Sequence, residues 1–110
     1  MVKYPADVKR LPGKERRRLR AQGVMLEPMV RIGKRGLTSG VIEEVDRQLE
    51  ERELVKVRFE RNILRRYDRK ELAAELARKV NAELIDVRGR TAVLFRPRQG
   101  WKRYLERFSR

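Results

Sequence analysis

The chain has 110 residues, a length that fits one folded domain, and it contains neither cysteine nor histidine. The lack of cysteine excludes disulfides and thiolate metal sites, and the lack of histidine removes the commonest general base and metal ligand. With a formal net charge of +14 and no apolar run long enough to be a membrane span or signal peptide, we expect a soluble, cytoplasmic protein. We expect no enzyme activity, no cofactor and no bound metal.

The first elements read as a lead-in, a helix and a strand. Residues 1–10 are expected to be a flexible lead-in to the domain. Residues 12–26 are predicted to form a helix that begins near Pro12, with a thin apolar stripe and cations on its other faces. Pro28 ends this pattern, and the short apolar run at 29–32 is predicted to be a strand.

A glycine-containing turn leads into a second predicted helix, over residues 39–52. Thr38 is expected to cap its N-terminus. Val41, Val45 and Leu49 fall on one face, which we expect to lie against the core. The acidic residues in the first half of this helix suit the positive end of the helix dipole.

The following segment alternates and then becomes helical again. Residues 54–59 alternate between apolar and basic side chains, which predicts a strand with one side solvated or facing a ligand. The pattern gives no prediction for residues 60–67. Asp68 is expected to cap a third helix, whose buried stripe runs from Leu72 to Val80.

The last third of the chain predicts a hairpin and a short helix. Residues 82–87 and 91–96 flank Gly89, which can take a positive φ at the tip of a β-hairpin. In residues 98–110 the aromatic side chains recur at helical spacing, which predicts an amphipathic C-terminal helix with a basic opposite face.

This order of elements, α-β-α-β-α-β-β, predicts an α/β fold. We expect a single compact domain over residues 11–97, with a four-stranded mixed sheet covered by helices and the C-terminal helix added to it. The first two strands are joined by a helix, so their connection is a right-handed crossover if they are parallel in one sheet.

The charge is unevenly distributed and rich in arginine. Of the 30 cations 22 are arginine, whose guanidinium pairs with phosphate oxygens and stacks on bases. Residues 1–36 carry 11 cations and 3 anions, whereas residues 37–60 carry 4 cations and 7 anions. We therefore expect one positive face that binds nucleic acid and a separate, neutral-to-acidic face.

The turn before the second helix reads Gly33-Lys34-Arg35-Gly36. Glycine lets the backbone approach a ligand closely, and the amides of such a turn and of the first helical turn are unpaired. Phosphate is favoured there, and Lys34 and Arg35 add full charges. We predict a phosphate clamp like the G-x-x-G loop that KH domains use on single-stranded RNA. Many tight turns share this spacing, so a turn with merely solvated cations is the alternative.

A longer run around this turn resembles a known family. The segments IGKRGLTSGVIEEVDRQLEERELVKV, LPGKERRRLRAQGVMLEPMVRIG and ELAAELARKVNAELIDVRGRTAVLFRP, and their order, resemble the CRM domain family. The family is named for chloroplast RNA splicing and ribosome maturation, and bacteria carry stand-alone YhbY-type members. The resemblance covers about residues 11–97, and Gly33 to Gly36 match the family loop position by position.

The resemblance implies a fold similar to the C-terminal domain of bacterial translation initiation factor three. It also implies RNA binding through the G-x-x-G loop and the neighbouring basic surface. For stand-alone bacterial members it implies association with precursors of the large ribosomal subunit. The tail after Pro97 departs from the short ends of those members.

Other cations are candidate RNA contacts. We expect the first helix to lie beside the glycine turn and to add phosphate contacts through Lys14, Arg16, Arg17 and Arg20. Arg31 precedes the turn and either reaches the same RNA backbone or pairs with a carboxylate of the second helix.

The hairpin tip and the tail hold further candidates. Arg88 and Arg90 flank the hairpin glycine and could touch RNA, although a polar tip is also normal in a protein without ligands. Trp101 either docks on the core or stacks on a base, and Lys102 lies beside it.

The expected function is binding of ribosomal RNA during assembly of the large subunit, by a monomer that binds no membrane and no small-molecule substrate. Two alternatives stay open. One is a sequence-independent DNA binder. The other is a protein-interaction module, which would use the acidic helix at 39–52 or the aromatic tail to dock an assembly factor or ribosomal protein.

Overall fold

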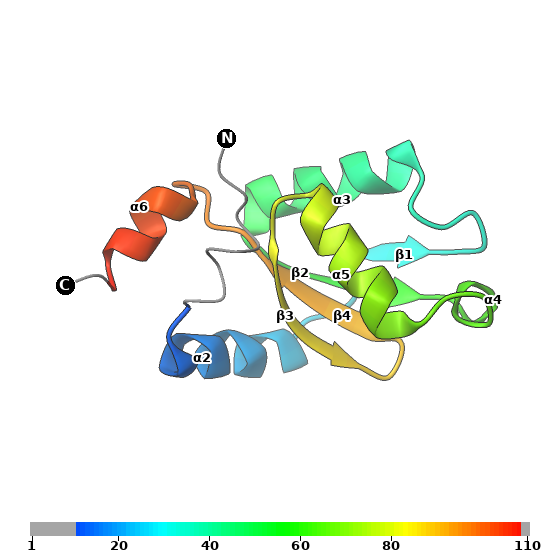
Figure 1. Cartoon of the computed structure of the whole chain (residues 1–110), viewed down its shortest axis with the longest axis horizontal. Helices are drawn as coiled ribbons and strands as arrows, with labels where there is room; N and C mark the ends of the chain where they lie inside the picture. The colour runs from blue at the N-terminus through cyan, green and yellow to red at the C-terminus, as the bar shows by residue number, and fades with distance from the viewer. Residues whose placement is uncertain (1–10, 109–110) are drawn as a thin grey trace.

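The computed structural model describes residues 11–108, and its elements follow the predicted order with one additional helix (Figure 1). The predicted lead-in at 1–10 lies outside the described residues. The elements are α2 (Gly13–Val24), β1 (Val30–Ile32), α3 (Ser39–Arg52), β2 (Leu54–Phe59), α4 (Arg61–Leu64), α5 (Arg69–Lys79), β3 (Glu83–Arg88), β4 (Thr91–Phe95) and α6 (Trp101–Glu106).

The four strands form one mixed sheet, as predicted, and their order in it is β1-β2-β4-β3. β1 and β2 are parallel and are joined through α3, whereas β2–β4 and β3–β4 are antiparallel. Gly89 takes φ +57° at the β3–β4 turn, which confirms the predicted hairpin tip. β1 is an edge strand, and the turn that follows it lies at one end of the sheet (Figure 1), with Lys34 and Arg35 exposed.

Helices cover both faces of the sheet (Figure 1). α3 and α5 enclose one core cluster, in which Val57 and Phe59 of β2 are fully buried. α2 and α6 enclose the second cluster on the other face, where Leu19 and Trp101 pack with Phe95. The alternation of β2 therefore sends its apolar side towards α3 and α5 and its basic side towards the face that α2 covers only in part.

Both predicted helix caps are present. The hydroxyl of Thr38 accepts a hydrogen bond from the Val41 amide at 3.1 Å. The carboxylate of Asp68 accepts from the amides of Lys70 and Glu71 at 3.0 and 3.1 Å. These bonds satisfy amides that a helix N-terminus otherwise leaves unpaired. They fix where α3 and α5 begin, at the same end of the sheet as the β1–α3 turn (Figure 1).

Helix α4 lies in the segment 60–67, for which the pattern of residues led to no prediction. It is a single turn, closed by a 3.4 Å hydrogen bond from the Leu64 amide to the Glu60 carbonyl. Its one fully buried side chain, Ile63, packs into the core under α3 and α5. This burial holds a turn that is too short to be stable alone.

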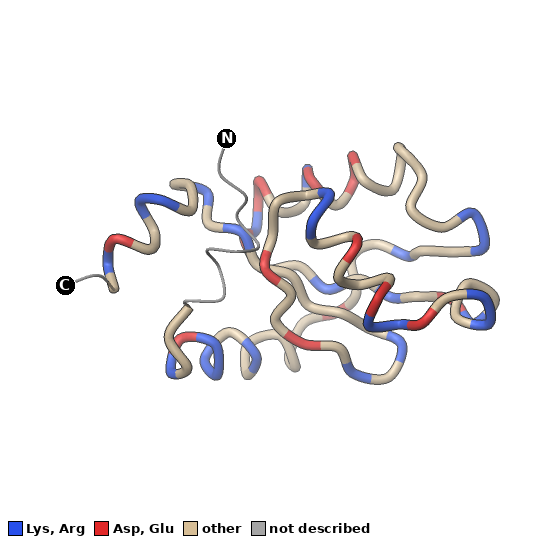
Figure 2. Tube along the Cα trace, viewed as in Figure 1, with Lys and Arg blue, Asp and Glu red and all other residues tan. Residues whose placement is uncertain are grey.

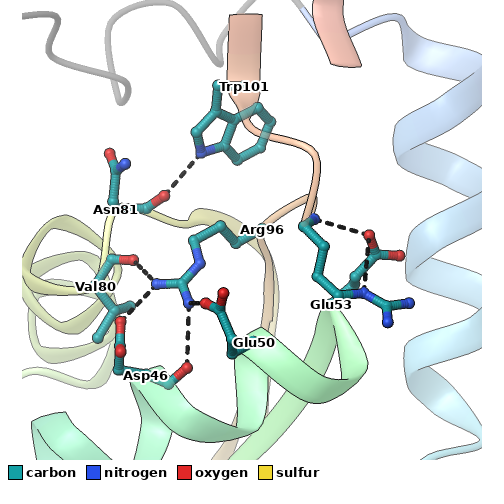
Figure 3. A network of polar contacts seen from close by, with 8 residues as sticks. Asp46, Glu50, Glu53, Val80, Asn81, Arg96 and Trp101 are labelled. Carbon is teal, nitrogen blue, oxygen red and sulfur yellow. Dashed lines mark hydrogen bonds and ion pairs between the residues drawn. The ribbon is translucent and has the colours of Figure 1, made fainter. Parts of the chain in front are cut away.

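Arg96 joins the acidic helix α3 to the end of α5 (Figure 3). Its guanidinium donates to the Asp46 carboxylate at 2.7 Å and to the Glu50 carboxylate at 2.9 Å. It also donates to the backbone carbonyl of Val80 at 2.8 Å. Two of the acidic residues of α3 therefore have a structural partner within the fold.

The C-terminal helix docks on the domain. Trp101 is 1% exposed, and its indole nitrogen donates to the Asn81 carbonyl at 2.8 Å. Tyr104 is also buried, and its hydroxyl donates to Glu15 of α2 in a short hydrogen bond. Burial, reinforced by the Glu15 carboxylate, raises the pKa of the Tyr104 phenol, which keeps the proton in this bond. α6 is thus part of the folded unit.

We predict that Trp101→Ala lowers the free energy of unfolding by about 3–5 kcal/mol, because it empties a packed site and removes the indole hydrogen bond. Urea unfolding followed by far-ultraviolet circular dichroism measures the change. Lys102→Ala, at an exposed neighbour, is the control and should shift stability by less than about 0.5 kcal/mol. Equal stabilities of the two variants would mean that α6 is not docked.

Candidate nucleic-acid interface

The glycine pair forms a tight turn between β1 and α3. The Gly36 amide donates to the Gly33 carbonyl at 2.8 Å, and the Thr38 amide donates to the Gly36 carbonyl at 3.0 Å. Gly36 takes φ +75°, in the left-handed region that glycine adopts without a Cβ penalty. The Glu60 amide donates to the Ile32 carbonyl at 2.9 Å, which ties the start of the turn to the end of β2. The turn is therefore fixed at both of its ends.

The two glycines shape the turn more than they expose it, which corrects the expectation that both let a phosphate approach. Gly36 is buried, and its amide is used within the turn. A Cβ at Gly33 would lie 2.8 Å from a carboxylate oxygen of Glu60, so this side of the turn faces an anion of the protein itself. A phosphate has to approach from the other side, at the tip.

The tip carries Lys34 and Arg35, and both are exposed. Within residues 11–108 neither side chain has an ion-pair partner, and neither backbone amide has an acceptor. Three residues separate the tip from the start of α3, a helix whose dipole favours an anion near its N-terminus. Free amides and full charges are thus combined at these two residues, and the phosphate clamp there stays a prediction.

A cleft of about 660 Å³ opens between this turn and helices α4 and α5. Its walls carry five cations and two carboxylates, and its floor is apolar. One carboxylate, Glu75, is already paired with Arg78 at 2.5 Å and with Lys79 at 3.5 Å. The lining residues are Lys34, Arg35, Gly36, Leu37, Ile63, Arg66, Tyr67, Glu71, Leu72, Ala74, Glu75, Arg78 and Lys79.

A row of arginines crosses the other face of the sheet at the same end. Arg31 of β1 pairs in register with Arg58 of β2, and Arg58 pairs with Thr91 of β4. Arg31 is exposed between two residues that are buried in the core under α3, so its side chain lies on the other face of the sheet. One of the two predictions for Arg31, pairing with a carboxylate of α3, is therefore wrong. Partial burial, and then the positive charges of Arg58 and Arg61, lower the pKa of the Arg90 guanidinium. Like charges are therefore close together at this place on the sheet.

These segments meet at what we call the loop end, formed by the β1–α3 turn (33–38), α4 and the β3–β4 turn. Figure 2 shows their Lys and Arg positions gathered at one end of the long axis, while acidic positions run along α3. Arg88 and Arg90 belong to this end, and Arg88 is also 3.5 Å from Asp86. The structure thus brings the two predicted hairpin cations to the same end as Lys34 and Arg35.

The cations of α2 are placed elsewhere, which corrects the expectation that this helix lies beside the glycine turn. Its N-terminal half lies towards the opposite end of the molecule and on the other face of the sheet from α3 (Figures 1 and 2). Arg16 is engaged within the fold, by Glu83 and by the Leu84 carbonyl at 3.2 Å. Lys14 and Arg17 are exposed there, and Arg20 is half-buried.

Trp101, the first residue of α6, is buried against the rest of the domain, and its indole nitrogen is hydrogen-bonded. It is therefore not available to stack on a base. Of the two alternatives for this residue, docking is correct. Lys102 is exposed, but α6 lies at the far end of the molecule from the loop end (Figure 1). Neither residue can act together with Lys34 and Arg35 on one short stretch of RNA.

Tyr67 and Arg66 line the cleft and were missed at the sequence level. Both are exposed and follow α4 directly, in the segment for which periodicity gave no prediction. The available signal was the run Arg65-Arg66-Tyr67 itself, since two cations beside an exposed aromatic residue are typical of single-strand binding surfaces.

Residues 11–108 contain neither a metal-binding cluster nor a membrane-spanning helix. No three His, Cys, Asp or Glu side chains in this range are grouped so that they could hold a metal ion. No helix in the same range has the length and apolar character needed to cross a membrane.

The sequence model of the CRS1/YhbY (CRM) domain matches residues 11–96, which is most of the chain. The chain belongs to the CRM domain family. This CRM domain is 48% identical over 97 residues to the probable RNA-binding protein MJ0652 of Methanocaldococcus jannaschii, an alignment that covers 88% of this chain and 72% of that protein. It is 33% identical over 86 residues to the probable RNA-binding protein YqeI of Bacillus subtilis, with 78% and 88% covered. Relatives thus occur in archaea as well as bacteria.

A solved structure shares the fold of this CRM domain. It is the solution structure of the hypothetical protein SAV1595 from Staphylococcus aureus, which is described as a candidate RNA-binding protein. The two structures superpose with a TM-score of 0.68 at 36% sequence identity. The superposition covers 79% of this chain and 88% of that one. The predicted family and fold class are both confirmed.

For the glycine turn we predict different costs at its two ends. Gly36→Ala should lower the free energy of unfolding by about 1–2 kcal/mol, because alanine is strained at φ +75°. Gly33→Ala should cost less, since the clash is with the mobile end of the Glu60 side chain. Denaturant unfolding of both variants measures this order, and an equal or reversed order would contradict the turn geometry.

Proposed function

We propose that this CRM domain binds RNA through its loop end. The observation that carries the proposal is that Lys34 and Arg35 project from a rigid turn, without carboxylate partners in the described chain, over a cleft with three more cations. Clustered cations repel one another, and a phosphate backbone relieves that repulsion by replacing many small counterions. The names of the relatives support RNA as the anion.

The partner that we propose is ribosomal RNA, during assembly of the large subunit. This finer assignment rests on the resemblance to stand-alone CRM proteins, whose family is linked with large-subunit precursors. The mode of action is binding without turnover, by a monomer. Sedimentation of cell extracts tests it: the protein should migrate with large-subunit precursors, and migration only as free protein would contradict the assignment.

The arginines of the opposite sheet face extend the proposed surface. Arg58 and Arg90 are adjacent, and Arg31 continues the row to the edge of the sheet next to the turn. A folded RNA that follows the loop end could thus meet cations on both sides of the edge strand. The acidic side of α3 faces elsewhere and would repel the same backbone (Figure 2).

We predict that Lys34→Asp with Arg35→Asp lowers RNA affinity at least about tenfold, because it replaces two phosphate partners with two repelling charges. The fold should survive, since both side chains are exposed. Fluorescence anisotropy with a labelled RNA hairpin that carries a single-stranded tail measures the affinity.

The matched control is Lys14→Asp with Arg17→Asp, which changes the net charge equally at exposed positions of α2. It should weaken binding only by the smaller, long-range effect of net charge. If the α2 variant lost as much affinity as the turn variant, or the turn variant lost none, the loop end would not be the clamp.

Binding should also depend steeply on salt. If about five phosphates are neutralised, the logarithm of the association constant should change with the logarithm of salt concentration by about −3.5 to −4.5, the range set by single and double strands. The anisotropy titration, repeated at several potassium chloride concentrations, gives this slope. A complex that is insensitive to salt would contradict phosphate binding.

A further inference from the structure

The cleft beside the glycine turn contains an exposed aromatic ring. Tyr67 is 50% exposed and lines the cleft directly after α4. Its backbone is fixed, because its amide donates to the Ile63 carbonyl at 3.1 Å. The Arg66 guanidinium carbon lies 5.9 Å from the centre of the Tyr67 ring. The fixed backbone therefore presents an exposed ring with a cation over one of its faces, so a base would stack on the other face.

The surroundings of Tyr67 match the two halves of a nucleotide. Leu37, Ile63 and Leu72 provide an apolar floor, which suits the face of a base. Lys34 and Arg35 line the cleft from the β1–α3 turn and suit a phosphate. The volume of about 660 Å³ lies within the range of pockets that enclose small ligands.

The other large apolar side chains that are exposed in residues 11–108 lack this setting. Val24 and Met25 lie at the end of α2, and Phe108 follows α6, so none of them lines the cleft. Phe108 also packs against Tyr104, with ring centres 5.4 Å apart. The exposure of Tyr67 is thus combined with a cavity and with cations, whereas the exposure of Phe108 is not.

We propose that the cleft binds one unpaired nucleotide of the RNA, with the base stacked on Tyr67 and its phosphate held by Lys34 and Arg35. The inference rests on the proposed RNA-binding function and narrows its ligand to RNA with accessible, unpaired bases. In a duplex each base is stacked and paired inside the helix, so its face cannot reach Tyr67. The carboxylate of Glu71 also lines the cleft, and a carboxylate can accept a hydrogen bond from an exocyclic amino group of a base.

The test compares Tyr67→Ala with Tyr67→Phe, which keeps the ring, and with Phe108→Ala, which removes an exposed ring at the other end of the molecule. Each full-length variant is titrated against a labelled single-stranded RNA and against a fully paired duplex of the same sequence. Tyr67→Ala should weaken single-strand binding about 5- to 100-fold, the range for the loss of one stacked base. Tyr67→Phe and Phe108→Ala should bind the single strand as the natural protein does, and duplex binding should not respond to Tyr67.

The outcomes separate this inference from the proposed function. If the natural protein and Tyr67→Ala bind single strands equally well, the stacking site is wrong and RNA binding stands. The same conclusion follows if the natural protein binds only the duplex. If it binds neither RNA, the proposed function fails first. Photo-crosslinking of 4-thiouridine RNA to the natural protein needs no variant to fold: a crosslink at Tyr67 supports the site, and crosslinks confined to α2 or α6 overturn it.

Discussion

The loop end depends on a backbone constraint, the closed turn from Gly33 to Gly36. Two hydrogen bonds close it, one within the turn and one from Thr38, and a third joins its start to β2. Because the turn is bonded at both ends, Lys34 and Arg35 are held in solvent without support from carboxylates in the described chain. A flexible loop with the same charges would have to be ordered on binding, at an entropic cost that this turn avoids.

The separation of charge along the chain has two different causes. On the α3 side, acidic residues are used within the fold, since Asp46 and Glu50 hold Arg96 and so join α3 to the end of α5 (Figure 3). At the loop end, cations are concentrated, and Arg90 lies near the positive charges of Arg58 and Arg61. The engaged carboxylates leave less of α3 free for a protein partner, which weakens the interaction-module alternative. The unpaired cations favour nucleic acid.

Local rules explain what the sequence could predict. The caps at Thr38 and Asp68 and the positive φ at Gly89 depend on bonds and sterics within a few residues, so composition and spacing reveal them. Most of the errors concern contacts between distant segments or elements too short for periodicity. Arg16 pairs with a carboxylate 67 positions away, and α2 lies on the sheet face away from α3. α4 is one turn held only by tertiary burial, so the cleft residues behind it were not predicted.

Nuclear magnetic resonance titration of the ¹⁵N-labelled protein with a single-stranded RNA tests the central claim most directly, because each backbone amide reports on its own surroundings. The account predicts that the largest chemical-shift changes fall at residues 34–37 and 61–72, with little change along the N-terminal half of α2 and along α6. Changes concentrated on α2 or α6, with the amides of Lys34 and Arg35 unmoved at saturation, would contradict it.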